Sequence, residues 1–77
     1  MPTQHQYETV KAQALAFTTF ELAIVKFDMG TYEQGACPIV KIWIGTKSWR
    51  FSDPDWDIVI RQLATLWLKL RCKYEMV

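Results

Sequence analysis

The clearest pattern of apolar and polar positions lies in the C-terminal third of the chain. On a helical wheel at about 100° per residue, eight of the apolar side chains between positions 56 and 74 fall within one stripe about 120° wide. They are Trp56, Val59, Ile60, Leu63, Leu66, Trp67, Leu70 and Tyr74. The pattern predicts a helix over about 54–74, with this stripe as its core face.

The charges at the two ends of this segment support the same helix. Ser52 or Asp53 is positioned to cap it, and Pro54 stands where a missing N–H costs nothing. Acidic residues in the first turn and basic residues in the last turns complement the helix dipole. These are Asp55 and Asp57 at the start, and Lys69, Arg71 and Lys73 at the end.

Runs of β-branched and aromatic residues in the middle of the chain predict three strands. The first covers 20–27 and is followed by a turn-like segment at 28–30. The second covers 38–44, with a proline at its start, where a strand tolerates it. A turn at 45–48 leads into a short third strand at 49–51. Alternation puts Val40, Ile42 and Ile44 on one face of the second strand, and Ile39, Lys41 and Trp43 on the other.

The N-terminal segment 4–17 is predicted to be a helix. Thr3 and Gln6 fit a capping box, and apolar residues recur at helical spacing behind them. The alternative is one continuous helix from 4 to about 28 that ends at Gly30. The β-branched residues Thr18, Thr19, Ile24 and Val25 favour a helix followed by a strand.

The expected architecture is therefore α+β, in the order α-β-β-β-α. A three-stranded antiparallel sheet packs on the long C-terminal helix within a single domain over 1–77. The segment 29–37 is the expected flexible connection. The length of 77 residues allows one small domain, and an apolar share of 51% argues against disorder.

Composition also argues against a membrane location, secretion and a strongly charged partner. No apolar run reaches the roughly 18–20 residues of a membrane span, and the N-terminus lacks the pattern of a signal peptide. A formal net charge of +1 gives no overall attraction to nucleic acid or lipid. Two cysteines, Cys37 and Cys72, cannot form the disulfide framework of a tiny secreted domain, and they bond only if the segment at 37 meets the helix end. We expect a cytoplasmic protein with no membrane partner.

No arrangement of reactive residues points to catalysis or a cofactor. His5 is the only histidine and lies near the N-terminus, and the two cysteines lack the paired spacing of a zinc site. Asp53, Asp55 and Asp57 alternate as in a calcium loop, but the glycine and the glutamate that such a loop needs are missing. We therefore expect no catalytic residue, no metal and no cofactor.

The order of elements resembles that of a double-stranded-RNA-binding domain over about residues 7–72. The spacing of Phe20-Glu21-Leu22, Pro38-Ile39-Val40-Lys41-Ile42 and Gly45 is similar to that of the family's first two strands. The family opens its last helix with lysines that hold phosphates, where this chain has Ser52-Asp53-Pro54-Asp55. Such an acidic cluster would repel the backbone of a duplex.

Nucleic-acid binding is accordingly the alternative function, through the second hairpin. Its cations would be Lys41, Lys47 and Arg50, and its stacking rings Trp43 and Trp49. The competing interpretation of these lysines is a solvated sheet edge.

The leading hypothesis starts from apolar residues that remain after the core is assigned. Ile58 and Leu68 lie opposite the core stripe of the last helix, and Ile39 and Trp43 face away from it. Exposed apolar patches on small domains usually mark protein interfaces. We expect a small non-enzymatic protein-binding module, with another protein, a complex or a second copy of the chain as partner.

In size and layout the chain resembles the small inhibitors encoded by phages and plasmids, anti-CRISPR proteins included. The resemblance implies a protein that occludes a surface of a larger protein or nucleoprotein complex. The candidate partner-binding residues are Trp43, Trp49, Arg50, Ile58, Leu68 and Tyr32.

Overall fold

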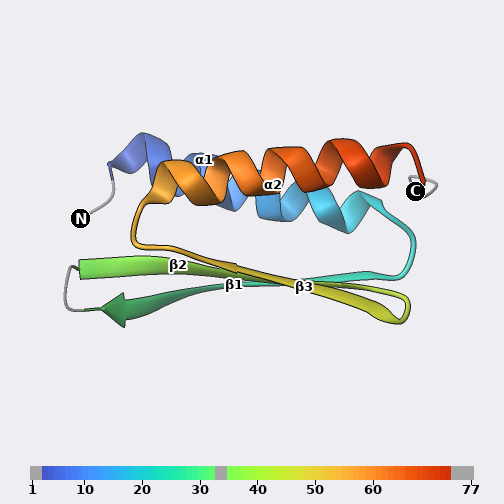
Figure 1. The fold of residues 1–77 in the computed structure, drawn as a ribbon, viewed down its shortest axis with the longest axis horizontal. Helices are drawn as coiled ribbons and strands as arrows, with labels where there is room; N and C mark the ends of the chain where they lie inside the picture. The colour runs from blue at the N-terminus through green and yellow to red at the C-terminus, as the bar shows by residue number, and fades with distance from the viewer. Residues whose placement is uncertain (1–2, 33–34, 74–77) are drawn as a thin grey trace.

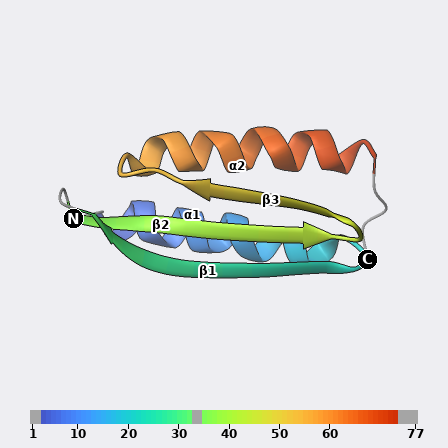
Figure 2. The ribbon, with the colours of Figure 1, turned by 60° about the horizontal axis from the view of Figure 1, so that its bottom comes forward.

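The described part of the chain forms two α-helices on one face of a three-stranded antiparallel sheet (Figures 1 and 2). The structure, a computed structural model, describes residues 3–32 and 35–73. The elements follow in the order α1 (Gln4–Ala16), a 3₁₀ turn (Phe17–Thr19), β1 (Ala23–Tyr32), β2 (Gly35–Ile44), β3 (Lys47–Ser52) and α2 (Trp56–Arg71). Strand β2 lies between β1 and β3. The predicted α+β class and the α-β-β-β-α order are confirmed.

Helix α1 begins at the capping box that the sequence predicts. The backbone N–H of Gln6 donates to Thr3 Oγ1 at 3.1 Å, and the N–H of Thr3 donates to Gln6 Oε1 at 3.0 Å. The α-helix ends at Ala16, where the Thr18 hydroxyl donates to the carbonyl of Leu15 at 2.6 Å. The chain then makes its 3₁₀ turn, so the alternative of one continuous helix over 4–28 is wrong.

Strands β1 and β2 form a longer hairpin than the sequence indicated. The pairing runs from Ala23 opposite Ile44 to Tyr32 opposite Gly35. The predicted turn at 28–30 is therefore strand, and so is most of the segment 29–37 that we expected to be a flexible connection. Residues 33–34 lie outside the described part of the chain.

Gly30 lies within β1, and the side chain of Ile39 on β2 occupies the space that a side chain at position 30 would fill. Gly30 pairs with Cys37, and a Cβ atom built on it would lie 2.7 Å from Ile39 Cδ1. The glycine thus admits a packed isoleucine side chain instead of marking a turn. At the other end of β2, Gly45 has a φ of 60° in the two-residue turn that leads to Lys47. Strand β3 consequently starts two residues before the predicted position.

Helix α2 starts two residues later than predicted. Its N-cap is Asp55, whose side chain accepts from the N–H of Asp57 at 3.0 Å. Asp53, which we expected to be a cap, instead accepts from the N–H of Asp55 at 2.8 Å, and Pro54 precedes the helix. The helix ends at Arg71, and Tyr74, predicted to lie on its core face, falls outside the described residues.

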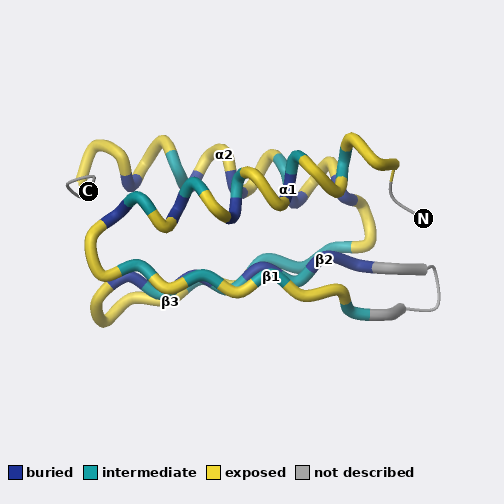
Figure 3. The backbone as a smooth tube through the Cα atoms, turned by 180° about the vertical axis from the view of Figure 1, so that it is seen from behind, coloured by how far each residue is buried: buried dark blue, intermediate teal, exposed yellow. Residues whose placement is uncertain are grey.

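The core lies between the helices and the sheet, and the buried positions of both helices turn towards the strands (Figure 3). The predicted core face of β2 is confirmed. The core cluster is Val10, Ala14, Phe17, Phe20, Val40, Ile42, Ile44, Trp56, Val59, Leu63, Leu66 and Leu70. Both helices pack on this side, so within the described residues no helix covers the opposite face of the sheet (Figures 1 and 3).

Both cysteines are free thiols. Cys37 is buried, with its Sγ 3.3 Å from Ser52 Oγ, and Cys72 is exposed at the end of α2. Among the residues that the structure describes, no helix has the length and apolar character required to cross a bilayer.

Candidate functional site

The uncovered face of the sheet carries the side chains that alternate with the core residues. Ala23, Val25 and Phe27 of β1 pack against the core, as do Trp49 and Phe51 of β3. Their neighbours in each strand point away from the helices. The strand register arranges these neighbours in three rows: Ile24–Trp43–Ser48, Lys26–Lys41–Arg50 and Asp28–Ile39–Ser52.

The middle row consists only of cations. Lys41 pairs with Lys26 on one side and with Arg50 on the other. Adjacent strands lie about 4.8 Å apart, so three positive charges occupy a line of about 10 Å. None of the three has an ion-pair partner within the described residues. Like charges directly opposite each other destabilise a sheet, so this row costs stability unless an anion neutralises it.

An apolar patch adjoins the cation row. Ile24 is 62% exposed and lies opposite the half-buried Trp43. Leu22, just before the strand, is 76% exposed and has a φ of 62°, in the left-handed region. We call five residues of this face, Ile24, Lys26, Lys41, Trp43 and Arg50, the docking face, and Leu22 lies next to its end, in the turn before β1.

The predicted partner-binding residues are divided among several surfaces. Trp43 and Arg50 lie on the docking face, whereas Trp49 lies on the helix side of the sheet. Ile58 and Leu68 are on α2, 36% and 59% exposed. Tyr32 ends β1, and its side chain is not among those described.

Sequence reasoning missed Leu22, Ile24 and Lys26. Ile24 and Lys26 alternate with Val25, so their orientation follows once a core face is assigned to β1. The exposed, left-handed Leu22 leaves no signal in the sequence.

A second concave surface, the seam, lies between β3 and α2, which run side by side (Figure 2). It contains two hollows, of about 410 and about 330 Å³, that share Trp49, Leu66 and Lys69. The first is also lined by Phe51, Arg61, Gln62 and Thr65, and the second by Lys47, Ser48, Leu70 and Lys73. No acidic side chain of the described residues lines either hollow.

The seam separates the cations proposed for nucleic-acid binding. Lys47 and Trp49 lie in it, whereas Lys41 and Arg50 project from the other side of the sheet. From the sequence, Lys69 and Lys73 were interpreted only as partners of the helix dipole, and Arg61 was not assigned to any site. Their spacing gave a partial signal, because Arg61 and Lys69 are eight residues apart and lie towards the same side of α2, whereas Lys73 follows the end of the helix.

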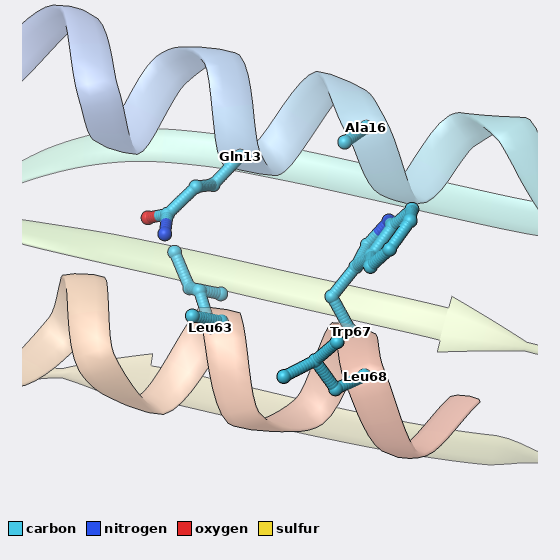
Figure 4. A pocket seen from close by; sticks show the side chains of 6 residues that line it. Gln13, Ala16, Leu63, Trp67 and Leu68 are labelled. Atoms are coloured by element: carbon cyan, nitrogen blue, oxygen red, sulfur yellow. The ribbon is translucent and has the colours of Figure 1, made fainter. Parts of the chain in front are cut away.

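A third hollow, of about 340 Å³, separates the two helices (Figure 4). The indole of Trp67 reaches from α2 towards α1 near Ala16. Gln13 Nε2 donates to the carbonyl of Ile60 at 3.0 Å, while Gln13 Oε1 and Trp67 Nε1 have no partner among the described residues. Both unpaired atoms are sealed from solvent, so a ligand reaches them only after side chains move.

Within the described residues, no group of three or more His, Cys, Asp or Glu side chains is placed to hold a metal ion. No protein-family model matches the chain, and comparisons with curated proteins and with solved structures also find no match.

Proposed function

We propose that the chain is a small non-enzymatic module that binds another protein through its docking face. The single observation that carries this proposal is a sheet face on which exposed apolar side chains adjoin three cations, where no described helix covers the face and no described residue forms an ion pair with the cations. The partner surface has complementary chemistry, with carboxylates opposite the cation row and an apolar patch opposite Leu22 and Ile24.

The physical terms favour a protein partner for this face. Burial of Leu22 and Ile24 contributes about 1.5–3 kcal/mol each, before the costs of association. Trp43 and Arg50 are of the residue types that dominate binding hot spots, and the cations increase association rate and selectivity. The molecule measures 38 × 21 × 15 Å, and its open sheet face lies along the longest and the shortest of these axes (Figure 1). This face is smaller than the roughly 800 Å² per partner of a standard interface, so its size suits a transient complex.

A second copy of the chain is a poor partner for the same face. A symmetric dimer places one surface patch against itself, which brings the row of Lys26, Lys41 and Arg50 close to an identical row. Like charges brought together at an interface cost several kcal/mol. We therefore propose a different protein, or a protein component of a nucleoprotein complex, as the partner.

Occlusion of a surface is the mode of action that suits such a module. A chain of 77 residues that binds through its open sheet face blocks access to the surface that it covers. The small phage- and plasmid-borne inhibitors that it resembles in size and layout, anti-CRISPR proteins included, act in this way. The proposed setting is the cytoplasm.

The test uses two exposed apolar residues on different surfaces. Ile24 is 62% exposed on the docking face and Leu15 is 60% exposed on α1, so Ile24→Glu and Leu15→Glu are matched substitutions. Proteins captured by the immobilised chain are compared for the wild type and both variants, and the candidate partner is then purified for titration calorimetry. We expect Ile24→Glu to weaken binding at least tenfold, or about 1.4 kcal/mol, and Leu15→Glu to change it less than about twofold. Equal losses in the two variants would contradict the proposal.

A further inference from the structure

We infer that the seam between β3 and α2 is a binding site for a phosphate-bearing aromatic ligand, a nucleotide or a single-stranded nucleic-acid segment. Trp49 stacks on the base, and the cations around it contact phosphates. The site is separate from the docking face, because the seam lies on the helix side of the sheet.

The size of the seam and its partly exposed indole suit a small ligand that carries an aromatic ring. Its two hollows meet at Trp49, and their volumes of about 410 and about 330 Å³ fall in the range of small-molecule sites. Trp49 is half-buried and packs against the core, so its ring is held in place before a ligand arrives. Stacking of a base on such a ring contributes about 1–3 kcal/mol and tolerates any base.

The charge of the seam fits phosphate. Arg61 and Lys69 line the first hollow, and Lys47, Lys69 and Lys73 line the second. None of these cations has an ion-pair partner among the described residues. Lys69 belongs to both hollows, so it is positioned to contact a phosphate in either one.

The acidic cluster that argues against duplex binding is distant from most of these cations. Asp53, Asp55 and Asp57 stand at the start of α2, and Lys69 and Lys73 at its end. The helix has 16 residues, or about 24 Å at 1.5 Å per residue. This exceeds the Debye length of about 8 Å at physiological salt, so the carboxylates are screened from a phosphate at the second hollow.

The experiment measures binding of a fluorescent oligothymidylate of about 12 nucleotides by anisotropy, between about 50 and 200 mM salt. Lys69→Glu removes the shared cation, and Lys11→Glu is the control, because Lys11 is an exposed lysine of α1 outside the seam. We expect Lys69→Glu to weaken binding at least tenfold and to flatten its salt dependence, and Lys11→Glu to change the affinity less than about twofold. Equal weakening by both would overturn the inference, since it would report net charge alone.

The ring is tested by Trp49→Leu, which keeps an apolar side chain against the core but cannot stack. We expect at least a fivefold loss of oligonucleotide affinity in a variant whose thermal unfolding shows that it is folded. Lys69→Glu carries the test if Trp49→Leu does not fold. A folded Trp49→Leu variant with wild-type affinity would overturn the inference.

Competitors distinguish the source of the ligand. Adenosine triphosphate that displaces the oligonucleotide identifies a nucleotide site, and displacement only by longer strands identifies a nucleic-acid site; both outcomes support the shared chemistry. Inorganic polyphosphate, a Glu-rich peptide or anionic phospholipid vesicles that compete as well as the oligonucleotide would overturn it, because none of them offers a base. Ile24→Glu is expected to leave oligonucleotide affinity unchanged, so this test and the test of protein binding fail independently.

Discussion

Leu22 combines an unfavourable backbone conformation with an exposed side chain. A left-handed conformation costs an L-residue about 1–2 kcal/mol, and Leu22 adopts it at a φ of 62°. Because the side chain is 76% exposed, burial within the molecule does little to offset this cost. Local strain of this kind concentrates at functional positions. In the proposed complex, contact with the partner supplies the missing burial.

This interpretation gives a stability prediction at residue 22. We expect Leu22→Gly to unfold about 4–8 °C higher than Leu22→Ala, because only glycine removes a left-handed cost of about 1 kcal/mol. Both variants lose the leucine side chain and should bind the partner equally weakly. Differential scanning calorimetry gives the comparison, and equal midpoints would show that the φ of Leu22 carries no cost.

Single residues also explain which boundaries could not be predicted. Thr18 favoured a strand by its β-branch, yet its hydroxyl donates to the carbonyl of Leu15 at the end of α1. Gly30 suggested a turn, yet it leaves room for Ile39 on a neighbouring strand. The pattern of β-branched residues and glycines does not indicate either contact, the hydrogen bond to Leu15 or the packing of Ile39 against Gly30. The cap of α2 is another case. The Asp53 side chain accepts from the N–H of Asp55 and closes a turn before the helix, so Asp55 becomes the N-cap.

Among the elements, strand β2 contributes to both sides of the sheet. Val40, Ile42 and Ile44 face the core, and Lys41 stands between two cations on the docking face. The core side contributes apolar burial, and the docking side sets like charges against each other. The sheet therefore retains an arrangement that lowers its own stability, and the anionic partner that we propose would relieve the repulsion.

Reversal of the middle charge should stabilise the sheet. Lys41→Glu replaces two repulsive cross-strand pairs with two attractive ones, each of about 0.2–1 kcal/mol. We expect the free energy of unfolding to rise by about 0.5–2 kcal/mol at low salt and the gain to shrink at high salt. Lys41→Gln, which removes only the repulsion, should lie between. Urea titrations at two salt concentrations provide the measurement, and a Lys41→Glu variant less stable than Lys41→Gln would contradict the prediction.

The elements themselves were largely predictable from the sequence, and the surfaces between them were not. A periodic apolar stripe defined α2, and alternation defined the core face of β2. The order α-β-β-β-α leaves open which face of the sheet α1 covers. Contacts between α1 and α2 place both helices on one side, which exposes the docking face and forms the seam. Both sites are thus products of tertiary packing.

The molecule as a whole separates its charges. Acidic residues gather before α2, while cations gather at its C-terminal end and across the open sheet. A formal net charge of +1 therefore conceals two strongly basic surfaces. Local fields of this kind steer charged partners even when the net charge is close to zero.

At this scale we expect a monomer. The cation row opposes face-to-face pairing of two copies, so sedimentation equilibrium at micromolar concentration should give a mass near 9.1 kDa. A mass about twice as large that returns to 9.1 kDa in the Ile24→Glu variant would show that the docking face binds a second copy, contrary to this expectation.

The contrast between the two thiols has a practical consequence. Cys37 is enclosed by the fold, whereas Cys72 lies open beside Lys73 at the end of the seam. A maleimide dye added to the folded, wild-type chain therefore attaches at one known point. The dye would stand next to the second hollow and away from the docking face. Its fluorescence would therefore report on binding at the seam without any engineered cysteine.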